Sequence, residues 1–356
     1  MKKRKMLALI LTAAVLSGCT NNSGENSDSS EPHTWDYPEI PEEFKPTYEI
    51  EPIKLNDYLS KAYDSSKVKQ YDKLKVYECS LTQLDKNAFL SLFSEPPVQN
   101  GINYSTVSES GYFRVYGNTK PEEKYDLKLI TSGVDYHKNG MTLYESIIRY
   151  LDSEIKENIK TNVLDFADRE EIENTTRELL KQFGITASEL TTYAVTAEEY
   201  SAIVEAIDEP RIEWSPAADF YYIEGIMTVD GVPVTYGKNS YNCYDDVMLE
   251  PTTFYAVYTK DGLVDFMLNN AWDIGGVISE SKILTLEEAE KIISEQYPPD
   301  GHYVNRNTVL SKAELFYRST YTKSGLQFIP CWGFYVAHRD EETLNITVNA
   351  VTGEIL

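Results

Sequence analysis

The stretch LTLEEAEKIISEQYP at residues 284–298 is the clearest helix signal in this 356-residue chain. Thr285 is followed three positions later by Glu288, which predicts a capping box at the start of the helix. Pro298 and Pro299 predict its end, because proline cannot continue a helix. Apolar residues recur between these limits at helical spacing, namely Leu286, Ala289, Ile292 and Ile293. The stretch therefore predicts a helix with one buried face.

Three strand-like runs follow this helix, at 313–321, 328–339 and 344–356. The middle run is apolar on both faces, with Phe328, Pro330, Trp332, Phe334 and Val336 on one face and Ile329, Cys331 and Tyr335 on the other. That pattern predicts a central strand, with Trp332 filling the core between sheet and helix. In the last run apolar residues alternate with Thr347 and Asn349, which predicts a strand covered on one face only.

A helix followed by antiparallel strands is also predicted upstream. Helical spacing gives one apolar face to Ile172, Thr176, Leu179, Leu180 and Phe183, and Gly184 predicts the helix stop. Asp230-Gly231 and Asp261-Gly262 each lie between strand-like residues, which is the strongest short hairpin signal. The chain therefore predicts an α+β fold class, in which repeated units pack helices on one face of curled antiparallel sheets.

By pattern, the chain after residue 46 divides into three segments. Residues 47–150 form an N-terminal α+β segment, residues 151–277 a middle α+β segment, and residues 278–356 a C-terminal unit. The middle segment is predicted to open with a helix, marked by Leu151, Ile155 and Ile159. The sequence leaves open whether the first two segments form one domain or share one sheet.

Residues 1–18 have the organisation of a bacterial export signal. Residues 2–5 are basic, and the apolar run 6–16 is far shorter than the ~20 residues of a membrane-spanning helix. The run ends in Leu-Ser-Gly followed by Cys19, which resembles the lipobox of bacterial lipoproteins at every position. In that family the chain is cleaved before the cysteine, and lipids carrying fatty acids such as palmitate are attached to it. The resemblance implies lipidation of Cys19 and attachment to the outer face of the cell membrane.

Residues 19–46 are rich in Asn, Ser, Glu and Pro, a composition that predicts a disordered tether. The whole chain has 33 basic and 57 acidic residues, and removal of residues 1–18, which hold four of the basic ones, leaves a net charge of −28. Such a surface repels the phosphates of nucleic acids and anionic lipid headgroups, so we expect neither to bind. Since no later run reaches ~18 apolar residues, we expect no transmembrane helix.

The sequence predicts no catalytic residue, no cofactor and no metal site. His33, His137, His302 and His338 show no metal-ligand spacing; His137 and His302 lie beside turn signals, and His338 closes a strand-like run. A GxSxG elbow and a glycine-rich phosphate loop are both absent from the sequence. These features argue against an enzyme.

Three cysteines follow Cys19 in the chain: Cys79, Cys243 and Cys331. They contain no CxxC pair, so they predict neither a disulfide framework nor a zinc site. Cys79 and Cys331 lie in apolar strand-like runs and are expected to be buried. One disulfide is compatible with an exported protein, but the sequence does not choose the pair.

Tyrosine is unusually abundant, with 27 residues and clusters at Tyr221-Tyr222, Tyr236/Tyr241/Tyr244 and Tyr317/Tyr321. Exposed tyrosines could stack on sugars or line a protein interface. The alternative is that the predicted strands simply favour tyrosine. The sequence leaves both interpretations open.

The C-terminal unit is similar to the PepSY-type family. ILTLEEAEKII, PCWGFYV and ITVNAVTGEIL reproduce its Glu- and Ala-rich helix and its closing strands; Thr352, Gly353 and Glu354 match, while Asn349 stands where Asp is common. The spacing of Pro330 and Trp332 resembles YycH/YycI-type regulatory domains. YYIEGIMTVDGVPVTYG resembles strands that precede such units in uncharacterised lipoproteins of Gram-positive bacteria. From the residues alone, Gly353 predicts a positive φ after the last strand.

This resemblance implies non-covalent partner binding outside the membrane and no catalytic residue. PepSY-type domains are regarded as regulators of peptidases, and YycH/YycI-type proteins restrain a sensor kinase. We therefore expect a non-enzymatic, lipid-anchored regulatory module whose partner is an envelope protein of one of these kinds. The alternative is a surface lipoprotein that binds carbohydrate or peptide, and a wall hydrolase is a third interpretation. The identity of the partner and the oligomeric state stay open.

Overall fold

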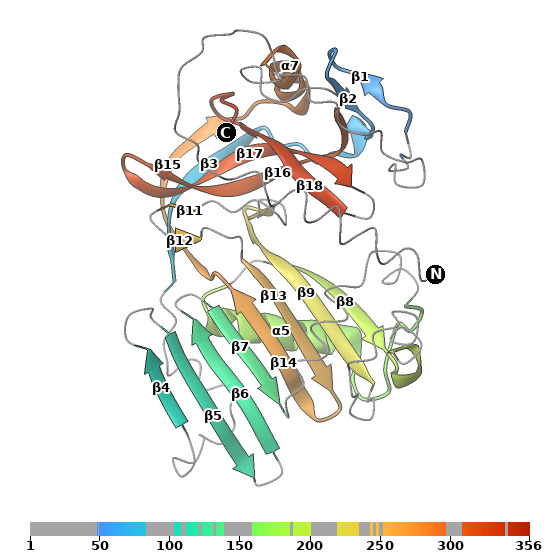
Figure 1. Cartoon of the computed structure of the whole chain (residues 1–356), viewed down its shortest axis with the longest axis vertical. Helices are drawn as coiled ribbons and strands as arrows, with labels where there is room; N and C mark the ends of the chain where they lie inside the picture. Colours follow the sequence, from blue (N-terminus) through green and yellow to red (C-terminus); the bar gives the residue numbers. More distant parts are fainter. Residues whose placement is uncertain are drawn as a thin grey trace, which may run out of the picture.

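The protein is mostly β-sheet with few helices among the residues that the structure, a computed structural model, describes. These are residues 48, 50–82, 103–107, 112–120, 123–130, 133–138, 159–185, 188–200, 219–234, 243–244, 247–248, 252–296, 308–338 and 341–356. Figure 1 shows two sheets, one above the other, with a helix against each. The sequence-based prediction of antiparallel sheets and helices is confirmed at this level.

The first sheet has seven strands in the order β1-β2-β16-β17-β3-β15, with β18 paired to β17. The pairing of β2 with β16 is parallel, and the other pairings are antiparallel. The strands are β1 (Ile53–Lys54), β2 (Leu59–Lys61), β3 (Lys73–Leu81), β15 (Trp272–Lys282), β16 (Thr308–Thr322), β17 (Gly325–His338) and β18 (Glu341–Asn349).

The second sheet has nine strands, all antiparallel, in the order β10-β9-β13-β14-β7-β6-β5-β4, with β8 paired to β9. The strands are β4 (Asn103–Val107), β5 (Tyr112–Lys120), β6 (Glu123–Ile130), β7 (Gly133–Lys138), β8 (Ser188–Val195), β9 (Phe220–Val229), β10 (Val232–Pro233), β13 (Thr253–Thr259) and β14 (Gly262–Asn269). A separate pair is formed by β11 (Cys243–Tyr244) and β12 (Val247–Met248).

The sheets divide the chain differently from the three segments predicted by pattern. Strands of residues 47–150 contribute to both sheets: β1 to β3 join the first, and β4 to β7 join the second. β7 pairs with β14, so residues 47–150 and 151–277 do share one sheet. The second sheet is thus inserted between β3 and β15 of the first. Local patterns cannot reveal this nesting, because they contain no information on which distant strand is the partner.

The helix predicted at 284–298 is α7 (Leu286–Gln296). Its capping box is formed: the Thr285 N–H donates to Glu288 Oε2 at 2.8 Å, and the Glu288 N–H donates to Thr285 Oγ1 at 3.2 Å. The predicted stripe is confirmed, with Leu286, Ala289 and Ile293 buried and Ile292 partly buried against the first sheet's core. Pro298 and Pro299 lie outside the described residues.

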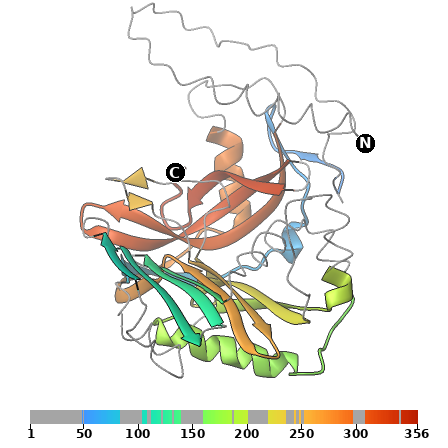
Figure 2. The ribbon, with the colours of Figure 1, turned by 60° about the horizontal axis from the view of Figure 1, so that its bottom comes forward.

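The second predicted helix is α5 (Arg169–Gln182), which lies across one face of the second sheet (Figure 2). Every residue of its predicted apolar face is buried: Ile172, Thr176, Leu179, Leu180 and Phe183. Gly184 has a φ of +78°, and the Ile185 N–H donates to Leu180 O at 3.1 Å, so the predicted glycine stop is confirmed. Residues 151–158, where another helix was predicted, are not among the described residues.

Both predicted hairpins form. Asp230 and Gly231 have φ values of +53° and +72° between β9 and β10, as a two-residue type I′ turn requires. Gly262 has a φ of +90° at the turn between β13 and β14. The first hairpin also joins the sheets: its residues Val229 and Val232 lie in the first sheet's core, and Tyr77 of β3 donates its hydroxyl to Asp230 Oδ2 at 2.7 Å.

The prediction that 328–339 forms a central strand is confirmed by β17. It pairs with β16 on one edge and with β3 and β18 on the other. Trp332 is fully buried, and its indole N–H donates to Leu284 O at 2.9 Å, just before α7. Trp332 therefore fills the core between sheet and helix, as predicted, and satisfies its own polar atom there.

The prediction that the last strand is covered on one face only is wrong. Thr347 and Asn349 of β18 are just 5% and 7% exposed. Asn349 is enclosed because its Oδ1 accepts from the N–H groups of Val351 and Thr352, which closes a turn through Gly353 at φ +78°. The chain then folds back, and the Leu356 N–H donates to Thr347 O at 2.9 Å. The positive φ predicted at Gly353 is confirmed.

Candidate functional site

β15 is the last strand of the first sheet, and no other described strand pairs with its second edge. Three apolar residues of β15 are strongly exposed: Ile274 at 41%, Val277 at 54% and Ile278 at 45%. Exposed edge strands are unusual in soluble proteins because their unpaired backbone groups recruit other strands. Among the described residues, this edge combines a free backbone with apolar side chains.

Two irregularities in the pairing of β15 with β3 shape this edge. The register shifts between Ile274 and Val277 and again between Val277 and Ser279. Glycine is required at the first shift, because a Cβ on Gly275 would lie 3.0 Å from Glu78 Cβ and 3.2 Å from Glu78 O. Bulges of this kind re-aim side chains and are treated as designed features of a sheet. Here they accompany the outward display of valine and isoleucine.

Charged residues flank the exposed apolar ones. Asp273 and Glu280 of β15 and Glu78 of β3 are exposed carboxylates, and Lys282 is an exposed ammonium at the end of the strand. Asp273 is held in place by the Thr82 hydroxyl, which donates to its Oδ1 at 2.9 Å. The edge therefore presents backbone hydrogen-bonding groups, three apolar side chains and fixed charges, which is the composition of a strand-addition site.

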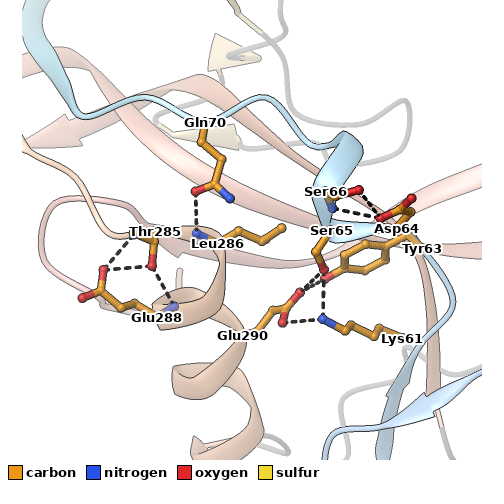
Figure 3. A network of polar contacts seen from close by, with 10 residues as sticks. All are labelled: Lys61, Tyr63, Asp64, Ser65, Ser66, Gln70, Thr285, Leu286, Glu288 and Glu290. Atoms are coloured by element: carbon orange, nitrogen blue, oxygen red, sulfur yellow. Dashed lines mark hydrogen bonds and ion pairs between the residues drawn. The ribbon is translucent and has the colours of Figure 1, made fainter.

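A second polar feature joins α7 to the chain before β3 (Figure 3). Glu290 is 8% exposed and accepts from Lys61 Nζ at 2.6 Å, from the Tyr63 hydroxyl at 2.9 Å and from Ser65 Oγ at 3.1 Å. Lys61 Nζ also donates to Ser65 Oγ at 2.9 Å. Every partner of this buried carboxylate lies in residues 61–65, on β2 and the following 3-10 turn.

This network is a structural clasp. A serine beside a lysine could suggest a nucleophile and its base, but an ammonium held by a carboxylate has no lone pair with which to accept a proton from Ser65. Burial, together with the Glu290 charge, raises the pKa of the Tyr63 phenol well above its usual range, so Tyr63 stays a neutral donor. Asn56 and Gln70 bond the last and first turns of α7, which extends the attachment along the helix.

Cys79 and Cys331 are buried free thiols, as expected for cysteines in apolar strands. Burial raises the pKa of each to about 12, so neither is a thiolate at neutral pH and neither acts as a nucleophile. The disulfide left open by the sequence therefore does not join this pair. Cys19 lies outside the described residues.

The histidines give one confirmation and one correction. His338 ends β17, as predicted. His137 was predicted in a turn but lies within β7, where it pairs with Asp265 of β14 and Asp126 of β6, because strand pairing continues up to Lys138. His33 and His302 lie outside the described residues. Within the described part of the chain, no group of three or more His, Cys, Asp or Glu could hold a metal ion.

The clustered tyrosines are largely core residues. Tyr221, Tyr222 and Tyr317 are buried, and the Tyr221 hydroxyl accepts from the Leu164 N–H at 2.9 Å and donates to Ala167 O at 2.8 Å. Tyr321 is exposed. The described tyrosine clusters therefore fill the sheets, and they offer no stacked surface for a sugar.

The comparisons with known proteins bear on the fold alone. No family model matches the chain, and no curated protein matches it. The crystal structure of an uncharacterised protein from Eubacterium rectale is similar, with a TM-score of 0.57 at 15% identity, over 86% of this chain and 92% of that one. No helix in the described residues is both long and apolar enough to cross a membrane.

Proposed function

We propose that the protein is a lipid-anchored, extracytoplasmic binding module that regulates another envelope protein through the β15 edge. The single observation that carries this proposal is the edge itself, with Ile274, Val277 and Ile278 exposed beside an unpaired backbone. Strand addition gives affinity through main-chain hydrogen bonds and specificity through side chains. A protein segment in extended conformation is therefore the class of ligand.

The anchor belongs to the proposal and rests on the sequence of residues 1–19. Cys19 is the proposed lipidation site, and the chain after it leads to β1, the first described strand. The clasp on Glu290 supports an anchored protein, because it fastens the first strands after the tether to α7. Metabolic labelling with a palmitate analogue tests the anchor: label is expected on the native chain and absent from Cys19→Ala.

We also propose that α7 with β16, β17 and β18 is a PepSY-like unit. Its support is the capped helix followed by antiparallel strands, and the turn in which Asn349 takes the position of the family's Asp. An amide oxygen can accept the two backbone hydrogen bonds that a carboxylate would accept. A loosely similar order, α5 followed by β8, β9, β13 and β14, supports the proposal of repeated units.

Site-specific photo-crosslinking in intact cells tests the binding function. A photoreactive residue at Val277 is expected to capture one defined envelope protein, a kinase ectodomain or a peptidase, while the same residue at exposed Glu178 on α5 is not. Capture should vanish in a Cys19→Ala background, which releases the chain from the membrane. Equal capture from both positions, or none from Val277, would overturn the proposal.

A further inference from the structure

The sequence of β15 is complementary to itself. An antiparallel strand with the same sequence can be placed so that Val277 faces Ile278 and Ile278 faces Val277. In that register Asp273 lies opposite Lys282 at one end, and Lys282 lies opposite Asp273 at the other. Cross-strand pairs of opposite charge and of β-branched residues each stabilise a sheet. The exposed apolar residues then lie at the centre, and the opposite charges close both ends.

We propose that the β15 edge pairs with the β15 edge of a second copy of this chain, antiparallel, about a twofold axis between Val277 and Ile278. The inference rests on the proposed function in one respect, since it takes β15 as the protein-binding edge and names its occupant. The pairing continues the first sheet from one copy into the next. It covers the apolar residues that the single chain leaves exposed.

The charges select this register over its neighbours. A shift by two residues would place Asp273 opposite Glu280, and like charges directly opposite one another destabilise a sheet. In the proposed register Glu280 faces Gly275, which has no side chain to clash with it. The twofold axis repeats each contact, so one attractive pair in the sequence becomes two in the dimer. A closed pairing of this kind also removes the edge from further association.

The tether makes a small interface sufficient. Specific interfaces that are stable in dilute solution bury about 1,200–2,000 Å², and one pair of strands supplies less. We therefore expect weak association in solution. Attachment of both copies to one membrane raises their effective concentration, in the same way as a linker between two binding modules. The dimer is thus expected to form mainly among anchored chains.

Charge exchange across the twofold axis tests the inference. The chain purified with its lipid anchor is examined by equilibrium sedimentation in detergent at about 0.15 M salt. Asp273→Lys and Lys282→Asp should each weaken dimerisation about tenfold, because each turns two attractive pairs into two repulsive ones. The double variant should return to within about threefold of the native chain, because both pairs are attractive again.

The control is Glu295→Lys, an exposed residue in the last turn of α7 that makes the same change of charge as Asp273→Lys. It should leave the dimer unchanged. Intact packing of each variant is checked by the near-ultraviolet circular dichroism of buried Trp272, at the start of β15. A chain that stays monomeric, or single variants that match the native chain, would overturn the inference.

The two proposals fail separately. Capture of an envelope protein at Val277 by a monomeric chain would overturn the dimer and leave the binding function standing. A dimer that responds to the charge exchange, with no envelope protein captured, would support the dimer and overturn the regulatory function. Photo-crosslinking of the chain to itself through Val277, in the native chain and in the double variant but in neither single variant, supports the dimer independently.

Discussion

β17 and β15 belong to one sheet and are separated by β3 alone, yet their surroundings are opposite. β17 is paired on both edges and buried on both faces, with Phe328, Trp332 and Phe334 fully enclosed. β15 is paired on one edge and exposes Val277 and Ile278. The same residue types therefore have different roles within about 10 Å, two strand spacings. On β17 they stabilise the fold, and on β15 they are available to a partner.

The largest expected effect contrasts a core residue with an edge residue. Trp332→Ala should lower the free energy of unfolding by about 3–5 kcal/mol, because it leaves a cavity between sheet and α7 and an unpaired carbonyl on Leu284. Ile278→Ala should change it by about 0.5 kcal/mol or less, because the side chain is already exposed. Urea unfolding of both variants measures the difference. Equal losses would show that β15 is part of the core.

The clasp on Glu290 is expected to give the next largest effect. Glu290→Gln should cost about 3 kcal/mol, since it leaves the Lys61 ammonium enclosed without its carboxylate. Glu295→Gln on the same helix, in an exposed pair, should cost less than about 1 kcal/mol. Lys61→Met with Glu290→Leu should recover much of the stability, because an apolar pair needs no counter-charge. If the double variant is as unstable as Glu290→Gln, the hydrogen bonds of Tyr63 and Ser65 dominate instead.

Alkaline pH should sharpen the contrast, because the thiols of Cys79 and Cys331 lie on β3 and β17. Their pKa is raised to about 12, so between about pH 9 and pH 12 the unfolded chain ionises them while the folded chain does not. Stability is full below pH 9 and should fall by about 1.4 kcal/mol per pH unit for each thiol above it. Chemical denaturation from pH 8 upward measures the slope. The thiol contribution should halve in Cys331→Ala, and an unchanged slope would contradict the assignment.

The smallest effect is expected at the start of α7. Thr285→Ala removes the capping box and should cost about 1 kcal/mol, while Thr285→Ser, which keeps the hydroxyl, should cost a few tenths. Thermal unfolding of the two variants gives the comparison. A loss as large as that of Trp332→Ala would mean that α7 holds the first sheet together by itself.

Local features could be predicted from the sequence. The capping box at Thr285, the hairpin at Asp230-Gly231 and the stop at Gly184 each depend on a few neighbouring residues, so a short window of sequence contains the whole cause. The pairing of β3 with β15 depends on residues almost two hundred positions apart, and no local pattern specifies it. For this reason the sheets, and with them the position of the β15 edge, had to come from the structure.

The candidate site was missed for two different reasons. Glu290 lies four residues after Leu286 and three before Ile293, so helical spacing places it beside the buried stripe, but its neighbouring carboxylates concealed it. For β15 the Gly275-Gly276 pair between β-branched residues is a bulge signal. Exposure, however, follows from being last in the sheet, which the sequence does not state.

The nested order of the sheets has a consequence for how the chain reaches its native state. The second sheet is continuous in sequence from β4 to β14, so it can assemble while the C-terminal residues are still crossing the membrane. The first sheet cannot, because β2 and β3 must wait for β15, β16 and β17. Pairings between distant segments are slow to form. The part of the protein nearest the lipid is thus the last to become ordered, and the binding edge appears when folding is nearly complete.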